Sequence, residues 1–422
     1  MINEAPLARF EPLGDKLLKP IYADYSFGNI PNTIHYLLTG ERLGNLLPED
    51  CFGGSYPRPE KVVLFFIDAF GWRSWQDHGR RFATTRRVMD EGVLTPISAL
   101  FPSTTAASVS TMNLGVLPAQ HALYEWNVYI PAFGEVIQTL PFSPLGQLSR
   151  EVCLQKGYDP GAMLAVRETV HERLAARGVH SIQFAHRNHA DSSFNRMVCA
   201  GSDVVPHVML SEAMVQLKEA LGAVKGKAWF NFYWASIDSI AHHYGPGTSY
   251  HAAEIAAFWS AFDALLSKLN SPNTLYLFTA DHDQVYARRD ETVYINERWP
   301  GLGESLAISP TGSTIYPNGS PRDLFLHLKP ERREDVLSLL KGELAGIATV
   351  MAVDEALEIG LFGPAPVAEE LRRRLGDVLV LAHDGHFVGW REPGLMENRF
   401  NGHHGGLAAR ELITAFGALD GL

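Results

Sequence analysis

Three aspartates stand where three separate apolar runs end. Asp68 follows VVLFFI, Asp238 follows WFNFYWASI and Asp281 follows LYLFTA. Such apolar runs are typical of buried parallel strands, and parallel α/β sheets bind their ligands outside the carboxyl ends of the strands. We therefore expect the three carboxylates to converge. Because unpaired carboxylates repel one another, we also expect a cation between them.

Histidines supply the remaining ligands of the expected site. His282 directly follows the third aspartate, and His242 lies four residues after the second, which is one helical turn. His403 and His404 occupy a late glycine-rich loop. Such a set of carboxylates and imidazoles without cysteine suits divalent metals, zinc first and manganese or iron as alternatives. Six side chains suffice for two metal ions with open positions, and paired metals are typical of in-line displacement at phosphorus.

The segment FPSTTAASVSTMNLG, residues 101–115, contains the candidate nucleophile. Its Ser/Thr start, small residues and final glycine predict a helix from about Thr105 to Asn113. A threonine at the start of a helix, beside two metals, can lose its proton and attack phosphorus, and the free N–H groups of the helix N-terminus favour the phosphoryl group. Thr104 and Thr105 both fit this description.

The elements that must position these residues alternate between helix and strand. Three helix–strand repeats, over residues 168–186, 211–238 and 249–283, predict an α/β fold with a doubly wound sheet. Residues 1–60 are expected to form an irregular segment packed on the core, with a short helix near Thr33–Leu38. Residues from about 286 to 400 are expected to form an inserted α+β lobe or lid. The end of the chain, after HHGG, is expected to be a helix.

The bulk composition limits the class of protein. The chain has 422 residues, 20% of them charged, and a net charge of −11. A nucleic-acid polymer as partner is not expected, because its backbone needs a basic surface, whereas a metal can hold a small anionic substrate. The three cysteines are widely spaced and odd in number, so we do not expect a fold held together by disulfides. Without an apolar leader or a run of about 18 apolar residues, we expect a cytoplasmic protein that makes no membrane contact.

Five motifs in order make the chain resemble the nucleotide pyrophosphatase/phosphodiesterase branch of the alkaline phosphatase superfamily. They are FFIDAFGW, FPSTTAASVSTMNLGVLPAQH, DSIAHHYGP, TADH and HHGG, and the resemblance spans residues 61 to about 420. It implies an alkaline-phosphatase-like three-layer sandwich over residues 61–422, with a large, mostly parallel central sheet, helices on both faces and the smaller inserted lobe.

The resemblance also implies the roles of the site residues. The implied ligands are Asp68, Asp281 and His282 for one metal, and Asp238, His242 and His404 for the other. Thr105 is the implied nucleophile, with its oxygen directed toward the first metal, because the attacking hydroxyl stands ten residues before the glycine matched by Gly115. Family phosphodiesterases hold a phosphoryl oxygen with an asparagine, which Asn127 matches one position away. Ala122, Ala241 and Asp283 stand where the family often has glycine, and Asp283 is expected to add negative charge near one metal and to narrow the substrate range.

These observations predict a metal-dependent phosphoester hydrolase. Thr105 is expected to form a phospho-threonine that water then hydrolyses. A monoester dianion calls for an extra cation, and no Arg or Lys adjoins the nucleophile segment. We therefore expect a phosphodiesterase or nucleotide pyrophosphatase acting on a small phosphorylated substrate, with a nucleotide as one candidate. The alternatives are a phosphomonoesterase, a phosphonate hydrolase with the same two metals, and an inactive metal-containing domain that binds ligands.

Overall fold

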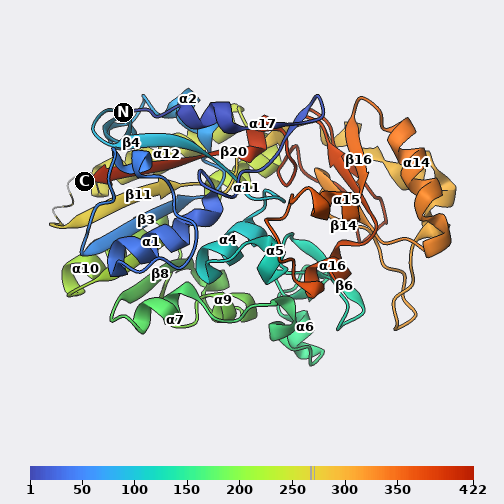
Figure 1. The fold of residues 1–422 in the computed structure, drawn as a ribbon, viewed down its shortest axis with the longest axis horizontal. Coiled ribbons are helices and arrows are strands. Elements are labelled where there is room, and N and C mark those ends of the chain that lie inside the picture. Colours follow the sequence, from blue (N-terminus) through green and yellow to red (C-terminus); the bar gives the residue numbers. More distant parts are fainter. Residues whose placement is uncertain (267–268, 270) are drawn as a thin grey trace.

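The computed structural model describes residues 1–266, 269 and 271–422. Its centre is a seven-stranded sheet (Figure 1). In spatial order the strands are β4 (Val93–Ser98), β20 (Ile413–Asp420), β11 (Thr274–Thr279), β3 (Lys61–Ile67), β10 (Ala228–Trp234), β8 (His180–His186) and β9 (Asp203–His207). All of them run parallel except β20, which pairs antiparallel with both β11 and β4. The expected α/β fold with a mostly parallel sheet is confirmed.

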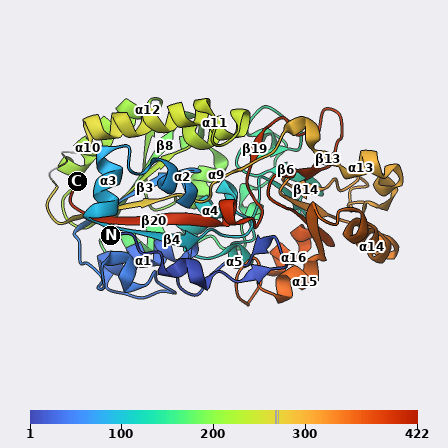
Figure 2. The same ribbon diagram turned by 90° about the horizontal axis from the view of Figure 1, so that it is seen from above.

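Helices cover both faces of this sheet, and the view from above shows the three layers (Figure 2). One face carries α2 (Trp72–His78), α3 (Ala83–Asp90), α10 (Leu210–Ala223) and α12 (Ser249–Leu265), and the other carries α1 (Ile30–Thr39), α4 (Thr105–Leu114) and α7 (Val170–Ala175). Strand β3 explains the arrangement. Val63, Phe65 and Ile67 pack in the core of the first face, while the residues that alternate with them pack in the core of the second. A strand buried on both sides is apolar throughout, as VVLFFI is.

The end of the chain differs from the expected helix. Only a four-residue turn, α17 (Ala409–Leu412), is helical, and the chain then continues as β20. The prediction of a helix here is wrong because Ile413–Asp420 lies between two strands, which pair with it on both edges. Gly417 fits closely under its neighbours, since a Cβ there would come within 2.9 Å of Val88 Cγ1. Pairing with distant strands overrides the helix propensity of the alanines and leucines.

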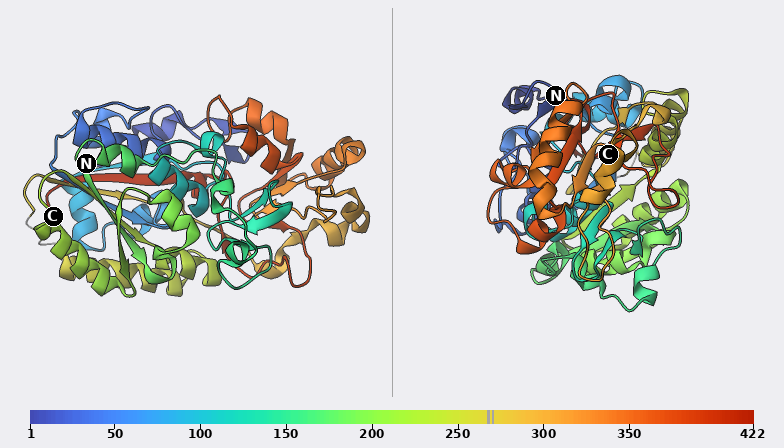
Figure 3. Two further views of the ribbon diagram at one scale, coloured as in Figure 1. Left: turned by 90° about the horizontal axis from the view of Figure 1, so that it is seen from below. Right: turned by 90° about the vertical axis from the view of Figure 1, so that its right-hand side faces the viewer.

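A second sheet lies beside the carboxyl ends of the central strands, at the right of Figure 1 and of the left view in Figure 3. Its antiparallel strands are β14 (Asn318–Gly319), β15 (Asp323–Leu326), β17 (Val378–Ala382) and β16 (Ala348–Ala352), with α14 (Arg333–Glu343), α15 (Val353–Glu358) and α16 (Glu369–Leu375) around them. A three-stranded antiparallel sheet of β5 (Asn127–Ile130), β6 (Glu135–Gln138) and β7 (Ser143–Pro144) lies next to it. The carboxyl ends of the central strands therefore face a second layer of structure.

Candidate metal centre and nucleophile

Three adjacent strands of the central sheet deliver the three aspartates. Asp68 directly follows β3, and Asp281 lies two residues beyond β11. Asp238 lies in the first turn of α11 (Ser236–Tyr244), which begins two residues after β10. The order β11, β3, β10 brings the three carboxyl ends side by side. The sequence pattern of apolar runs ending in aspartate therefore corresponds to one edge of the sheet.

The first group of side chains surrounds His282. Its Nε2 lies 3.3 Å from Oδ2 of Asp281 and 3.7 Å from Oδ1 of Asp68. Both distances are longer than a good hydrogen bond, and they suit atoms that face a common bound ion. Oδ1 of Asp68, Oδ2 of Asp281 and Nε2 of His282 make no hydrogen bond within the described structure. Since the three side chains are fully buried, these unpaired atoms call for a bound partner.

The second group is built around Asp238. Nε2 of His242 lies 3.4 Å from Oδ2 of Asp238, and Nε2 of His404 lies 3.8 Å from Oδ1 of the same carboxylate. The ring of His404 also stacks on that of His282, with the ring centres 3.6 Å apart. Ligand atoms of Asp238 lie within 4.8 Å of those of His242 and His404, and equally of those of Asp68 and His282. Asp238 thus belongs to both groups and links them into one centre.

Backbone carbonyls set the orientation of both imidazoles in the second group. Nδ1 of His242 lies 2.8 Å from the carbonyl oxygen of Gly402, and Nδ1 of His404 lies 2.8 Å from that of Ser103. A carbonyl oxygen only accepts, so Nδ1 carries the hydrogen in each ring. The lone pair is then on Nε2, the atom that faces Asp238. This is the usual arrangement of a metal-ligating histidine.

Electrostatics at this centre favour a cation. Burial raises the pKa of Asp68 well above its usual range, and the neighbouring Asp281 and Asp238 raise it further. Burial likewise raises the pKa of Asp238 and of Asp281. Burial lowers the pKa of His282 and His404, which keeps the rings neutral. Neutral imidazoles, carboxylates with unpaired oxygens and the absence of cysteine fit a borderline divalent metal, so the donor set present suits the group that the sequence implied.

The structure distinguishes the two threonines of the nucleophile segment. Thr104 is the N-cap of α4: its hydroxyl donates to the carbonyl of Tyr124 at 2.7 Å and accepts from the N–H of Ala107 at 3.3 Å. Thr105 is the first residue of the helix, and its hydroxyl lies 3.3 Å from Oδ2 of Asp68. Thr105 therefore faces the candidate metal-ligand groups, whereas the hydroxyl of Thr104 is engaged in capping.

Asn127 and His403 lie outside these groups. Asn127 begins β5, and its side-chain amide donates to the carbonyl of Gly319 at 3.4 Å, with no hydrogen bond to Thr105 or to an aspartate of the centre in the described structure. Nε2 of His403 lies 2.8 Å from Oδ1 of Asn398, while His404 faces Asp238. The choice of His404 is thus consistent with the geometry, and the role of Asn127 stays a prediction.

Two supporting residues were not found from the sequence. Gln284 donates from Nε2 to Oδ1 of Asp238 at 2.5 Å and to its carbonyl at 3.1 Å. Tyr233, in β10, donates its hydroxyl to Oδ2 of Asp68 at 2.5 Å. The only available signal was position, since Gln284 stands two residues after His282 and Tyr233 lies within the apolar run that precedes Asp238.

A three-layer sandwich with this centre at the carboxyl edge of its sheet defines the class of protein: the fold is that of the alkaline phosphatase superfamily. Within it, the chain belongs to the type I phosphodiesterase / nucleotide pyrophosphatase family, whose model matches residues 62–407. The family suggested by the five motifs is confirmed. Membership makes the protein a relative of phosphoester hydrolases. Comparison with curated proteins gave no match.

Two solved structures show the same fold. Murine ectonucleotide pyrophosphatase/phosphodiesterase 5, as an inactive threonine-to-alanine variant in complex with AMP, has a TM-score of 0.63 and 15% sequence identity, covering 85% of this chain and 88% of that one. Phosphonoacetate hydrolase from Sinorhizobium meliloti 1021, in complex with phosphonoacetate, has a TM-score of 0.61 and 16% identity, covering 87% of this chain and 92% of that one. At these identities the likeness is one of fold.

Among the described residues, no helix has the length and apolar character that a membrane crossing requires.

Proposed function

We propose that the protein hydrolyses phosphodiesters or nucleotide pyrophosphates at a centre of two divalent metals, with Thr105 as the nucleophile. One observation carries the proposal. The hydroxyl of Thr105 lies 3.3 Å from Oδ2 of Asp68, beside a buried cluster in which Oδ1 of Asp68, Oδ2 of Asp281 and both ring nitrogens of His282 lack hydrogen-bond partners in the described structure. A capping or core role would leave those polar atoms satisfied.

The residues divide the work as follows. Asp68, Asp281 and His282 would hold one metal, and Asp238, His242 and His404 the other. Bound divalent metals, most simply zinc, would supply Lewis acidity and lower the pKa of a coordinated hydroxyl. The hydroxyl of Thr105 releases its proton to solvent, and Oγ1 forms a bond to phosphorus while the bond from phosphorus to the leaving oxygen breaks. The leaving oxygen takes up a proton from solvent. Water later cleaves the phospho-threonine, and its protons go to Oγ1 of Thr105 and to solvent. The N–H groups of the first turn of α4 begin at Thr105 and favour the anionic phosphoryl group.

The charges around the centre favour a diester over a monoester. Within the described ranges, the three aspartates of the centre form ion pairs with histidines and with no lysine or arginine. A monoester dianion carries one more negative charge than a diester and gains more from a fixed cation. AMP in one structural relative and phosphonoacetate in another are consistent with a small phosphorylated substrate. A phosphonate is the second candidate, because the latter relative is a phosphonoacetate hydrolase.

One set of assays tests this function. The zinc-loaded protein is offered bis-p-nitrophenyl phosphate, p-nitrophenyl phosphate and phosphonoacetate, and we expect turnover to be greatest with the diester. Thr105→Ala should abolish turnover while metal content stays near that of the wild type. Acid quenching during turnover should trap a phosphate on Thr105 that mass spectrometry locates. Turnover by Thr105→Ala, or full activity in verified metal-free protein, would overturn the mechanism, and equal inertness toward all three substrates would identify a binding domain.

A further inference from the structure

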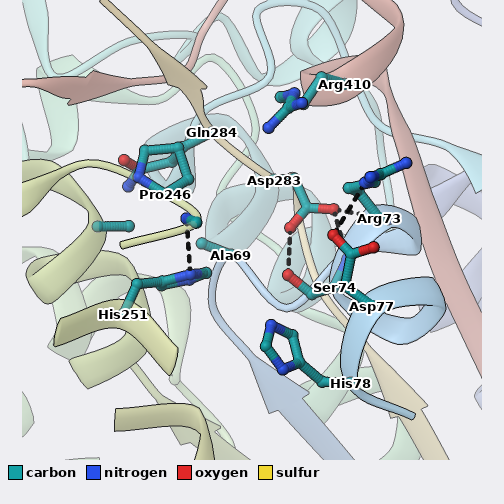
Figure 4. Close-up of a pocket in the computed structure, with 12 residues that line it drawn as sticks. Ala69, Arg73, Ser74, Asp77, His78, Pro246, His251, Asp283, Gln284 and Arg410 are labelled. Atoms are coloured by element: carbon teal, nitrogen blue, oxygen red, sulfur yellow. Dashed lines mark hydrogen bonds and ion pairs between the residues drawn. The ribbon is translucent and has the colours of Figure 1, made fainter. Parts of the chain in front are cut away.

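Asp283 is a buried carboxylate that the proposed chemistry does not use. It directly follows His282 and is 5% exposed. Its two oxygens accept four hydrogen bonds from the start of α2: Oδ1 from the N–H of Gly71 at 3.2 Å and the hydroxyl of Ser74 at 2.7 Å, and Oδ2 from the N–H groups of Arg73 at 2.9 Å and Ser74 at 3.4 Å. Figure 4 shows the carboxylate beside Ser74 at the wall of a small pocket. The carboxylate is therefore turned toward α2.

The segment that Asp283 holds is the one that presents Asp68. Only Ala69, Phe70 and Gly71 separate Asp68 from α2. Ala69 has a φ of +58°, a left-handed conformation that costs a non-glycine residue about 1 kcal/mol or more and persists only where the surroundings enforce it. Gly71 approaches Asp283 so closely that a Cβ there would lie 2.8 Å from Oδ2. The turn after Asp68 is thus strained and tightly fitted.

A further contact joins the same two segments. The N–H of Ala69 points to Oδ1 of Asp281 at 3.4 Å. With the four bonds to Asp283, it links the stretch that carries Asp68 to the stretch that carries Asp281 and His282. The members of the first metal group come from two strand ends far apart in sequence, and their separation depends on this link. The positive end of the α2 backbone faces the Asp283 carboxylate and offsets its charge.

We propose that Asp283 is a positioning residue: by clamping the start of α2 it holds Asp68 at coordinating distance from Asp281 and His282, and so sets the metal affinity of this group and not that of the second. The inference rests on the proposed function, because it presumes that these side chains bind a metal. It differs from simple helix capping, which would change stability alone. His242 and His404 are oriented by the carbonyls of Gly402 and Ser103 and do not depend on Asp283.

Zinc titration of metal-stripped protein against a chelating dye tests the clamp. Asp283→Asn keeps the volume but turns an amide N–H toward the N–H groups of α2. We expect wild type and Asp283→Asn each to bind two zinc ions. One of the two dissociation constants should be about tenfold to a hundredfold higher in Asp283→Asn, which is the usual effect of replacing a residue that orients metal ligands. Excess zinc should restore turnover of Asp283→Asn but not that of Thr105→Ala. The matched control is Thr169→Ala, which removes the cap of α7, where the hydroxyl accepts from the N–H of Glu172 at 3.1 Å.

The outcomes separate the two proposals. If wild type binds two zinc ions and Asp283→Asn binds both with unchanged constants, losing stability only as Thr169→Ala does, the clamp is refuted and the proposed function stands. If wild type binds no zinc, both fail. Should Asp283→Asn not fold, Ser74→Ala removes one of the four bonds, and the same constant should rise by about threefold to tenfold. An unchanged constant in Ser74→Ala likewise refutes the clamp.

Discussion

Tyr233 and Asp68 are joined by a hydrogen bond of 2.5 Å, from the phenol to Oδ2 of the carboxylate. The hydroxyl of Thr105 approaches the same oxygen at 3.3 Å, while Oδ1 of Asp68 makes no hydrogen bond in the described structure. The two oxygens thus have different surroundings, one held by hydroxyl donors and the other open to a cation. Burial and then the charge of Asp68 raise the pKa of Tyr233 well above its usual range, so the phenol remains a donor.

Replacing this phenol should lower activity without removing the metals. In Tyr233→Phe, Oδ2 of Asp68 loses one of its two hydroxyl donors, so the carboxylate is held less firmly in the orientation that places Oδ2 beside Thr105. A hydrogen bond to a charged group contributes about 1.5–3 kcal/mol, so we expect kcat/KM to fall about tenfold to a hundredfold, with zinc content unchanged. The matched control is Tyr36→Phe, which should retain wild-type kinetics. Among the hydrogen bonds of the described residues, the hydroxyl of Tyr36 takes part only in one from Arg58. Equal kcat/KM in both variants would exclude this role.

Asp238 should matter to both metals. Its carboxylate lies within reach of His242 and His404 on one side and of Asp68 and His282 on the other. We expect Asp238→Asn to lower the zinc content, measured by elemental analysis after dialysis, below one ion per chain. His242→Ala removes a ligand from the second group alone and should leave about one ion. If both variants lose one ion each, Asp238 serves a single metal.

Much of this centre could be predicted from local patterns. Asp68, Asp238 and Asp281 follow apolar runs, and the four-residue spacing to His242 is that of a helical turn. The features that escaped prediction depend on contacts across the fold. Nothing in ARELITAF shows that strands flank Ile413–Asp420 on both edges. The direction of a side chain is equally non-local, which is why the carboxylate of Asp283, expected to add charge near a metal, instead caps α2.

The neighbouring threonines should give opposite results. Thr104→Ala removes the cap of α4, which typically costs about 1 kcal/mol in the free energy of unfolding. It leaves the hydroxyl of Thr105 in place, so turnover should stay within about tenfold of wild type, whereas Thr105→Ala should lose turnover with stability nearly unchanged. Urea unfolding and diesterase assays on the two variants check both halves. A Thr104→Ala protein that is stable but inactive would show that Thr104 is the nucleophile and that Thr105 is not.

His121 should make the stability of the protein depend on pH. It is fully buried at the end of α5 (Pro118–His121), where Nδ1 accepts from the N–H of Leu123 at 3.1 Å and Nε2 lies 3.0 Å from the hydroxyl of Thr111. Nδ1 therefore carries the lone pair, and the ring is neutral. Burial, with Arg374 adding to it, lowers the pKa of His121 to about 3.

The sign follows from the unfolded chain, where a histidine has a pKa of about 6.5 and binds a proton more readily than in the folded state. The contribution of His121 is therefore fully present above about pH 6.5 and is lost as the pH falls toward 3, with about 2 kcal/mol gone at pH 5. His121→Asn keeps an acceptor for Leu123 but does not titrate. The test is urea unfolding of metal-stripped protein at pH 7 and pH 5. Between these pH values, the free energy of unfolding of His121→Asn should fall by about 2 kcal/mol less than that of wild type. If the free energy of unfolding depends on pH identically in His121→Asn and in wild type, His121 is not a source of the pH dependence.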